Sequence, residues 1–308
     1  MKRMTALFLT GLLLLLIFAG CRTTPPVVTT TKTPVVTTTT TPPPTTTIPP
    51  ATTTVPPTTA PQPVGWTEQD GRLYYYTEDS VMLTGWQEID GKLVYFTPDG
   101  PMAVGKQEID GVTRWFGSDG VEILLVNPWN FMPEDYAPEV VEVTGWWWKS
   151  SVVCHDALQE MLQACRDAGL KPYIASAYRT HGDQRWLYNN KVQNLMNQGY
   201  GEEEAKRLAG TVIAVPGTSE HELGLAFDLT DDSYRNLDEA QENTAVQKWL
   251  MENSWRYGFI LRYPNNKSEV TGIIYEPWHY RYVGKEIAQE IYESGLCLEE
   301  YLEAITPK

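Results

Sequence analysis

A run of threonine and proline over residues 22–64 limits which parts of the chain can fold. The run holds 12 of the 22 prolines and no acidic residue. Because it has little apolar surface to offset the entropy lost on ordering, we expect no packed core there. In polyproline geometry, at about 3.1 Å per residue, the run would reach roughly 130 Å and act as a stiff tether. The folded parts must therefore follow it.

The first 21 residues resemble an export signal. Two basic residues precede an apolar stretch over residues 7–18, and a pair of small residues leads to Cys21. Small residues before a cysteine resemble the cleavage site of a bacterial lipoprotein, which implies a lipid on Cys21. The alternatives are an ordinary secretion signal or a short transmembrane anchor, although the apolar stretch is short for a full span. All three place the rest of the chain outside the cytoplasm, and the favoured one anchors it to the cell membrane.

The charge of the chain excludes one class of partner. The formal net charge is −15, and the Thr/Pro run contributes no acid, so the excess of acid lies in the folded part. An acidic surface repels phosphate backbones. We therefore expect no nucleic acid as a partner.

A repeat with a period of 20 residues follows the run, over residues 65–122. Its copies start at Gly65, Gly85 and Gly105, with Asp-Gly pairs at 70–71, 90–91 and 110–111. An Asp-Gly pair between strand-like runs is a strong signal for a two-residue hairpin turn. Because a lone hairpin cannot bury its aromatic face, we expect a short module of stacked β-hairpins.

The repeats resemble the choline-binding and glucan-binding repeats of bacterial surface proteins. That family holds choline in an aromatic cage through cation–π attraction. Trp66 and Trp86 match the family's Gly-Trp positions, whereas the third copy has Lys106. The family's usual aromatic, two residues after the hairpin glycine, is replaced by Leu73, Leu93 and Thr113. The resemblance implies binding to a cell-wall polymer, and the departures leave a structural spacer as an equal alternative.

From residue 123 to the C-terminus the pattern changes to mixed helix and strand. Helical spacing covers residues 154–168, 186–196, 202–208, 244–255, 286–294 and 298–304, and strand-like runs cover 171–175, 225–229 and 273–282. We expect an α+β domain in which helices pack around a small, largely antiparallel sheet. Its three cysteines lack C-x-x-C spacing, and we expect buried thiols rather than ligands or disulfides.

Two histidine motifs in this domain offer the donors of a metal site. His221 lies seven residues before Asp228, and His279 lies in the sequence Glu-Pro-Trp-His-Tyr. Two histidines and one aspartate supply three zinc ligands and leave a position for water. Glu276, three residues from His279, is placed to act as a general base on that water. By spacing alone, a capped loop histidine and a solvated aspartate remain the alternative.

The same segments resemble the VanY-like D-alanyl-D-alanine carboxypeptidases. Residues 219–228 follow the S-x-H-x-x-G-x-A-x-D signature, and residues 276–280 match the family's second metal motif. Residues 176–184 resemble the substrate-binding S-x-Y-R-x-x-x-x-Q element, and residues 125–136 resemble the N-terminal lead-in.

The resemblance implies that Zn²⁺ is held by His221, Asp228 and His279, with Glu276 as the catalytic base. Arg179 would pair with a substrate carboxylate or with the oxyanion of the tetrahedral intermediate, and a buried salt bridge is the alternative. The substrate-binding residues implied by the resemblance are Ser176, Tyr178, Arg179, Gln184 and Ser219.

The implied activity is removal of the terminal D-Ala from the stem peptides of peptidoglycan. An L,D-carboxypeptidase acting on tetrapeptide stems is the alternative within the enzyme class, because the same zinc site serves both reactions. A non-catalytic wall-binding lipoprotein would account for the repeats but has no need of Glu276. The expected order is a signal peptide at 1–21, a tether at 22–64, the repeats at 65–122 and the zinc carboxypeptidase domain at 123–308.

Overall fold

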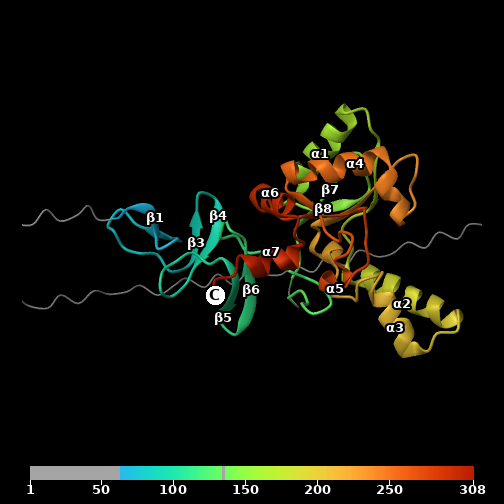
Figure 1. Ribbon diagram of the computed structural model, residues 1–308, viewed down its shortest axis with the longest axis horizontal. Helices are drawn as coiled ribbons and strands as arrows, with labels where there is room; N and C mark the ends of the chain where they lie inside the picture. Colours follow the sequence, from blue (N-terminus) through green and yellow to red (C-terminus); the bar gives the residue numbers. More distant parts are fainter. Residues whose placement is uncertain (1–62, 134–135) are drawn as a thin grey trace, which may run out of the picture. The chain divides into compact units, whose positions relative to one another are not determined.

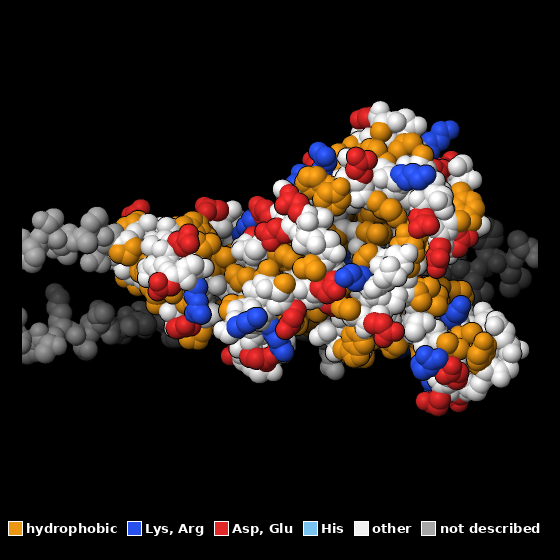
Figure 2. Space-filling model, in the orientation of Figure 1, with side chains coloured by type: hydrophobic (Ala, Val, Ile, Leu, Met, Phe, Trp, Pro, Cys, Tyr) orange, Lys and Arg blue, Asp and Glu red, His pale blue; other side chains and the backbone are white. Residues whose placement is uncertain are grey.

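A computed structural model describes residues 63–133 and 136–308 of the chain. The expectations for the export signal, for Cys21 and for nearly all of the Thr/Pro run fall outside the described residues. None of the described helices combines the length and the apolar character that crossing a bilayer requires. Figure 2 shows acidic side chains scattered over the described surface, as the net charge of −15 predicts.

Each 20-residue repeat forms one antiparallel hairpin, as the Asp-Gly pattern predicts (Figure 1). The paired strands are β1 Gly65–Gln69 with β2 Arg72–Tyr76, β3 Gly85–Ile89 with β4 Lys92–Phe96, and β5 Gly105–Ile109 with β6 Val112–Phe116. In the first turn Asp70 and Gly71 have φ angles of 51° and 73°. Two successive positive φ angles are what a type I′ turn requires, and the other two turns repeat them.

Aromatic side chains join each hairpin to the next one. The Trp66 ring lies 5.2 Å from the Tyr75 ring of its own hairpin and 5.8 Å from Phe96 of the second. The Trp86 ring repeats this arrangement, 5.1 Å from Tyr95 and 5.8 Å from Phe116 of the third. The 20-residue repeat therefore places the tryptophan of one hairpin against the phenylalanine of the next.

A four-stranded antiparallel sheet, with strand order β11-β12-β10-β9, forms the centre of the region that follows the repeats. Its strands are β9 Pro172–Ser176, β10 Ala226–Asp231, β11 Phe259–Leu261 and β12 His279–Tyr282. The long extended segment expected over 273–282 is wrong for its first six residues, which form a bend and a turn. Pro277 cannot donate to a strand ladder, and the turn leads the chain into β12.

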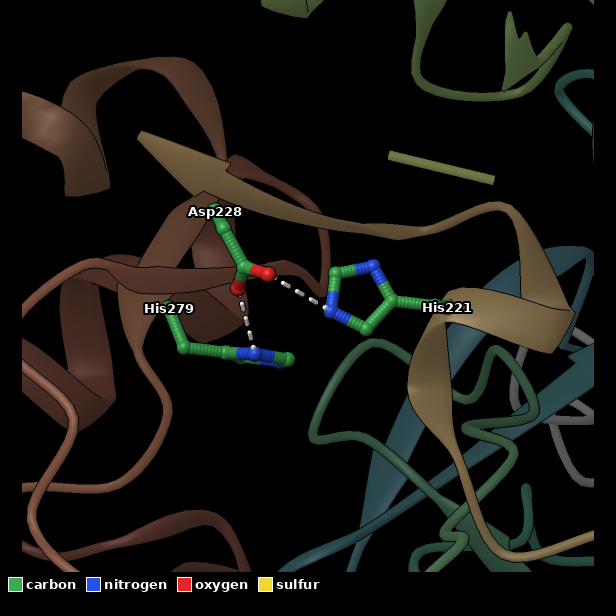
Figure 3. A group of neighbouring side chains, drawn as sticks. All are labelled: His221, Asp228 and His279. Atoms are coloured by element: carbon green, nitrogen blue, oxygen red, sulfur yellow. Dashed lines mark hydrogen bonds and ion pairs between the residues drawn. The ribbon is translucent and has the colours of Figure 1, made fainter. Parts of the chain in front are cut away.

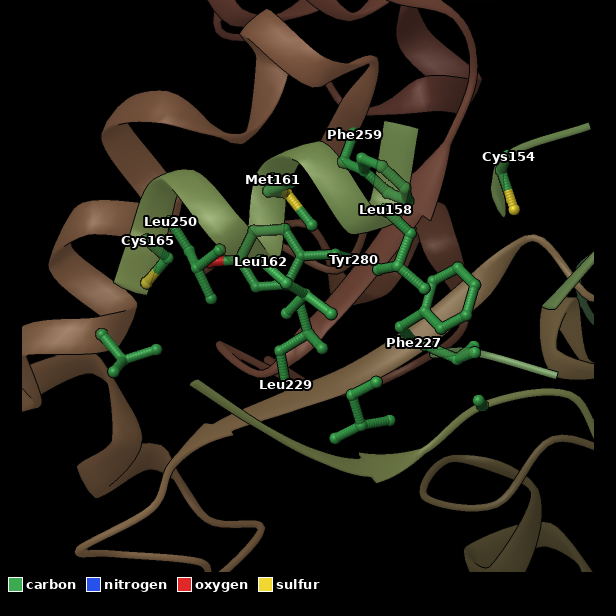
Figure 4. Close-up of a cluster of buried hydrophobic side chains, with 14 residues drawn as sticks. Cys154, Leu158, Met161, Leu162, Cys165, Phe227, Leu229, Leu250, Phe259 and Tyr280 are labelled. Atoms are coloured by element: carbon green, nitrogen blue, oxygen red, sulfur yellow. The ribbon is translucent and has the colours of Figure 1, made fainter. Parts of the chain in front are cut away.

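One face of this sheet carries the hydrophobic core, under helices α1 (His155–Asp167) and α4 (Ala245–Asn253). Figure 4 shows α1 side chains packed against Phe227 and Leu229 of β10 and Tyr280 of β12. Because side chains alternate along a strand, Asp228 and His279, the neighbours of these residues, belong to the opposite face. The N-cap of α1 is Cys154, and His155 is the first helical residue.

The remaining elements surround this sheet. Helices α2 and α3 form an adjacent pair at one end of the described part (Figure 1). Helix α2 begins earlier than the sequence pattern predicted, because Thr180 and Asp183 form a capping box ahead of a polar first turn. The other bounds are α2 His181–Asn197, α3 Glu202–Gly210, α5 Ser268–Thr271, α6 Lys285–Ser294, α7 Leu298–Ala304, β7 Val140–Glu142, β8 Lys149–Ser151, η1 Glu220–Leu223, η2 Glu239–Asn243 and η3 Ser254–Tyr257.

The third repeat packs against the C-terminal helices α6 and α7. Trp115 of β6 joins a hydrophobic cluster that contains Ile123, Ile287 of α6 and Leu298 of α7. The Ser118 hydroxyl donates a hydrogen bond to Glu290 of α6 over 2.7 Å. The third hairpin therefore shares a core with the helices, whereas the first two hairpins stack on it.

Candidate active site

The predicted metal ligands meet on the sheet face opposite the hydrophobic core. Asp228 of β10 and His279 of β12 are directly paired in the antiparallel register, and His221 comes from the short helix η1. The Oδ1 atom of Asp228 lies 3.1 Å from Nδ1 of His279, and its Oδ2 atom lies 3.3 Å from Nε2 of His221 (Figure 3). All three side chains are buried, and their ligand atoms lie within 4.8 Å of one another.

Two local irregularities bring these side chains together. Gly224 ends η1 with a φ angle of 70°, and its N–H donates to the carbonyl of His221 over 3.1 Å. The chain thereby reverses into β10 within a few residues, so that Asp228 faces His221. A bulge between β9 and β10 then shifts the register, so that Ser176 stands opposite Asp228 while Leu229 pairs with Ile174.

The protonation state of His221 suits a metal ligand. Its Nδ1 atom lies 2.8 Å from the carbonyl oxygen of Ala177. A carbonyl can only accept a hydrogen bond, so Nδ1 carries the proton and Nε2 presents its lone pair toward Asp228. Burial and the nearby charge of Arg179 lower the pKa of His221 to about 4. The imidazole is therefore neutral at neutral pH, as metal ligation requires.

Asp228 and His279 form the charged pair of the set. Burial alone would raise the pKa of Asp228, but the neighbouring His221 and His279 hold it well below its usual range. Burial opposes the charge on His279, yet the carboxylates of Asp228 and Glu220 beside its ring raise its pKa to about 9, so metal binding there must release a proton. Two imidazoles and one carboxylate around one point are the donor set of a catalytic zinc site, so the residues present fit that metal.

Glu276 lies beside the ligand set. Its Oε2 atom is 3.6 Å from Nδ1 of His279, and its backbone N–H donates to the Tyr263 carbonyl over 3.1 Å. Burial raises the pKa of Glu276 to about 8. A carboxyl group with a pKa near neutrality can both accept and return a proton, which is the property a general acid–base group needs.

Arg179 is held in place by hydrogen bonds from three of its nitrogen atoms. Nε donates to the Ser176 hydroxyl over 2.9 Å, and Nη1 donates to Oε1 of Gln184 over 3.0 Å. Nη2 donates to Oδ2 of Asp228 over 3.1 Å, so the salt bridge considered as an alternative is present and its partner is a predicted metal ligand. Gln184 is fully buried and also donates to the Ala214 carbonyl. Ser176 and Gln184 thus fix the orientation of the Arg179 guanidinium by accepting hydrogen bonds from it.

A cavity of about 280 Å³ opens onto the ligand set. Arg179, Ser219 and Glu276 are among the predicted residues that line it, together with the three ligands. Tyr178 is half-buried and does not belong to the lining; its backbone N–H donates to the Lys149 carbonyl. The apolar lining, which the sequence patterns did not identify, consists of Leu187, Val212, Ile213, Leu237, Ile273 and Trp278.

Two buried glutamates of the first histidine motif were also missed from the sequence. Glu220 accepts hydrogen bonds from the buried Arg262 and Arg281. Glu222 accepts from the Gly217 N–H and pairs with His181 over 2.8 Å. Both occupy variable positions of the signature, so no sequence pattern distinguished them from ordinary surface acids.

Two family models match separate regions of the chain. Residues 150–285 match the VanY family, described as D-alanyl-D-alanine carboxypeptidase. Residues 83–124 match a choline-binding repeat family.

Individual relatives are similar to a large part of the chain. A D-alanyl-D-alanine carboxypeptidase of Enterococcus faecalis is 44% identical over 180 residues, which span 58% of this chain and 65% of that protein, slightly less than two thirds of its length. A solved vancomycin-resistance D,D-pentapeptidase, VanY, in complex with Zn(II) is 44% identical with a TM-score of 0.52, covering 58% of this chain and 97% of that one. A solved LD-carboxypeptidase, LdcB, is 32% identical with a TM-score of 0.52, covering 71% and 94%.

The antiparallel sheet, the three-ligand set with its neighbouring glutamate, and the family match over residues 150–285 agree with one another. The chain belongs to the VanY family of D-alanyl-D-alanine carboxypeptidases, with hairpin repeats of the choline-binding type preceding the matched region.

Proposed function

We propose that this protein is a zinc-dependent D,D-carboxypeptidase that removes the terminal D-Ala from peptidoglycan stem peptides outside the cytoplasm. The observation that carries the proposal is the buried His221–Asp228–His279 set with Glu276 beside it at the end of the cavity. A relative solved with Zn(II) is described as a D,D-pentapeptidase, which supports the choice of metal and reaction.

Bound zinc would supply a Lewis acid for the scissile carbonyl and lower the pKa of the attacking water. Glu276 would accept the water proton at its carboxylate and deliver it to the leaving amine of D-Ala. The guanidinium of Arg179 brings positive charge to the ligand end of the cavity, where it can attract a terminal carboxylate or a developing oxyanion. Glu276 is buried and the Arg179 side chain is only 18% exposed, so little water competes with these interactions.

The cavity lining favours small apolar side chains in the substrate. Its walls away from the ligands come from residues such as Leu187, Ile213 and Leu237. A D-Ala-D-Ala terminus offers two methyl groups to such walls, whereas an L,D substrate places a long diamino acid next to the scissile bond. We therefore favour the pentapeptide over the tetrapeptide as substrate.

Attachment to the wall and to the membrane belongs to the same proposal. Trp66 and Trp86 are each partly exposed and stand beside a tyrosine and a phenylalanine, an arrangement suited to a cationic or sugar group of a wall polymer. A lipid on Cys21 and the Thr/Pro tether would hold the enzyme at the membrane while it reaches into the wall.

Mass spectrometry of stem peptides tests the reaction. The protein is incubated with pentapeptide or tetrapeptide, with zinc or with a chelator, and as the Glu276→Gln variant. Glu269→Gln, which removes an exposed carboxylate, is the matched control. We expect the parent and Glu269→Gln to remove one alanine from the pentapeptide in a chelator-sensitive reaction, and Glu276→Gln to remove none. Loss from the tetrapeptide only would move the assignment to L,D cleavage, and loss from neither with zinc bound would favour the wall-binding lipoprotein.

Sedimentation with purified cell walls tests the repeats. A double Trp66→Ala, Trp86→Ala variant should stay in solution, while Trp147→Ala, which removes an exposed tryptophan outside the repeats, should sediment like the parent. Equal sedimentation of all three proteins would leave the repeats as a spacer.

A further inference from the structure

We infer that Glu220 is a positioning residue for the metal ligand His279, fixing the ring so that Nδ1 faces the metal. The inference rests on the zinc site proposed above. It concerns a glutamate that belongs neither to the three ligands nor to the acid–base group.

The first observation is a pair of buried atoms that face each other. Oε2 of Glu220 lies 3.5 Å from Nε2 of His279. Neither atom has a hydrogen-bond partner among the described residues, although both are buried. On the other side of the ring, Nδ1 of His279 lies 3.1 Å from Oδ1 of Asp228. A proton on Nε2, directed at Glu220, would satisfy both buried atoms and leave Nδ1 on the side of the ligand set.

The second observation is that the Glu220 carboxylate cannot turn away. Its Oε1 atom accepts from Nε of Arg262 over 2.7 Å and from Nη1 of Arg281 over 2.9 Å. Two hydrogen bonds donated by guanidinium groups favour the ionised form of this carboxyl group. The carboxylate is therefore an acceptor only, so the proton between Glu220 and His279 must belong to Nε2 of the histidine.

The two arginines are themselves fixed by distant parts of the chain. Arg262 makes a bidentate pair with Glu299 of α7, at 2.8 and 2.6 Å. Arg281 donates to the Leu124 carbonyl over 3.0 Å. The segment that follows the third repeat and the C-terminal helix thus both hold the carboxylate that faces His279.

The two histidine ligands are therefore oriented by different groups. His221 donates through Nδ1 to the carbonyl of Ala177, which leaves Nε2 for the metal. His279 would donate through Nε2 to Glu220, which leaves Nδ1. Groups that hold metal-binding histidines in this way usually change metal affinity by 10- to 100-fold when removed.

Glu222 supplies a matched control. It is buried, lies two residues from Glu220 on the same short helix, and makes hydrogen bonds to Gly217 and His181. It does not pair with any of the three ligands. Glu220→Gln and Glu222→Gln therefore remove the same charge from neighbouring buried positions.

The experiment compares zinc affinity, measured by competition with a chromophoric chelator, and the visible spectrum of the cobalt(II)-loaded protein. Melting of the metal-free variants is measured in parallel to record purely structural effects. Glu220→Gln should weaken zinc binding by about 10- to 100-fold and shift the cobalt bands, whereas Glu222→Gln should change neither. Unchanged affinity and spectrum in Glu220→Gln would overturn the inference.

A measurement on the parent protein keeps the inference testable if Glu220→Gln fails to fold. Nitrogen-15 NMR of the zinc-loaded protein should show His279 protonated at Nε2 and bound through Nδ1, with the opposite assignment for His221. A proton on Nδ1 of His279 would overturn the inference even if the enzyme cleaves stem peptides normally. Failure of the parent protein to bind zinc at all would instead overturn the proposed function, and the inference with it.

Discussion

Burial determines how the thiols of this protein react. Cys154 and Cys165 belong to the core over the sheet, and Cys297 precedes α7; all three are free and buried. Burial raises the pKa of Cys154 and Cys165 to about 12 and that of Cys297 to about 11. Because the thiolate is the reactive form, these residues behave as small hydrophobic side chains, as the sequence predicted.

Alkylation of Cys154, Cys165 and Cys297 should therefore fail in the native protein at pH 8 and succeed after denaturation. Iodoacetamide treatment followed by peptide mass spectrometry assigns the label to each cysteine. Labelling of Cys154 without denaturant would contradict the buried position.

The Glu220 cluster predicts a particular dependence of stability on pH. The folded-state pKa of Glu220 is held by Arg262 and Arg281 below the unfolded value of about 4.3. Its contribution to stability is therefore present above pH 4.3 and declines as pH falls below it. The difference in melting temperature between the parent and Glu220→Gln, both metal-free, should be largest at pH 7 and smaller at pH 3. A difference that stays constant would show that the carboxylate charge does not stabilise the fold.

At this scale the sequence reveals residues whose type is chemically unusual. His221, Asp228 and His279 were predicted as ligands because few side chains bind zinc, and the structure brings all three together. Glu220 was not predicted, because its role depends on two arginines 42 and 61 residues away, one directly after β11 and one in β12. Contacts over that distance leave no local pattern.

Among the elements, the turn at Gly224 has the clearest consequence. The chain turns tightly between His221 and Asp228, where Gly224 has a φ angle of 70°. A Cβ atom at Gly224 would lie 3.0 Å from the backbone nitrogen of Ser151, whereas one at Gly295, which has a similar φ angle of 68°, would meet nothing within 4 Å.

Gly224→Ala should thus combine backbone strain with a clash. We expect Gly295→Ala to lose about 1–2 kcal/mol of unfolding free energy from strain alone, and Gly224→Ala to lose more and to bind zinc more weakly. Urea unfolding and chelator competition measure the two effects. Equal losses in both variants would show that Ser151 moves aside.

Periodicity predicted six helices correctly in type, because each has an apolar stripe or a clear stop. It placed the start of α2 too late, since residues 181–185 are polar and only the Thr180–Asp183 capping box marks the true beginning. It missed β11, because three residues are too few for an alternating pattern. It extended β12 into a turn for which Pro277 was the available signal.

For the whole molecule, the third repeat forms the junction between the hairpins and the helices. Its N–H at Lys106 bonds the Thr306 hydroxyl, and Gly105 lies so close to Thr306 that a Cβ atom would clash. This copy meets α7 instead of a fourth hairpin, which explains why a tryptophan is not needed at Lys106. The predicted boundary at residue 123 therefore follows the change of pattern, but core contacts cross it.

Truncated chains test whether the helical region folds independently from residue 123 or needs the third repeat. A chain beginning at residue 105 should melt close to one beginning at residue 65, because it keeps Trp115 and Ile123 on the helices. A chain beginning at residue 125 loses both side chains and the Leu124 carbonyl, and its melting temperature should fall by more than about 4 °C. Equal melting of all three would show that the helical part folds independently of the repeats.

The ligand set also determines what the protein is without its ion. A strand pair, a glycine turn and a backbone carbonyl hold the three donors in place, and each of these contacts is made by the chain itself. In a zinc finger the ion organises the chain, whereas here we expect the fold to preorganise the metal site. Stripping the ion should silence the enzyme without unfolding it. The metal-depleted protein would then remain folded but inactive, and activity would return when the medium supplies zinc.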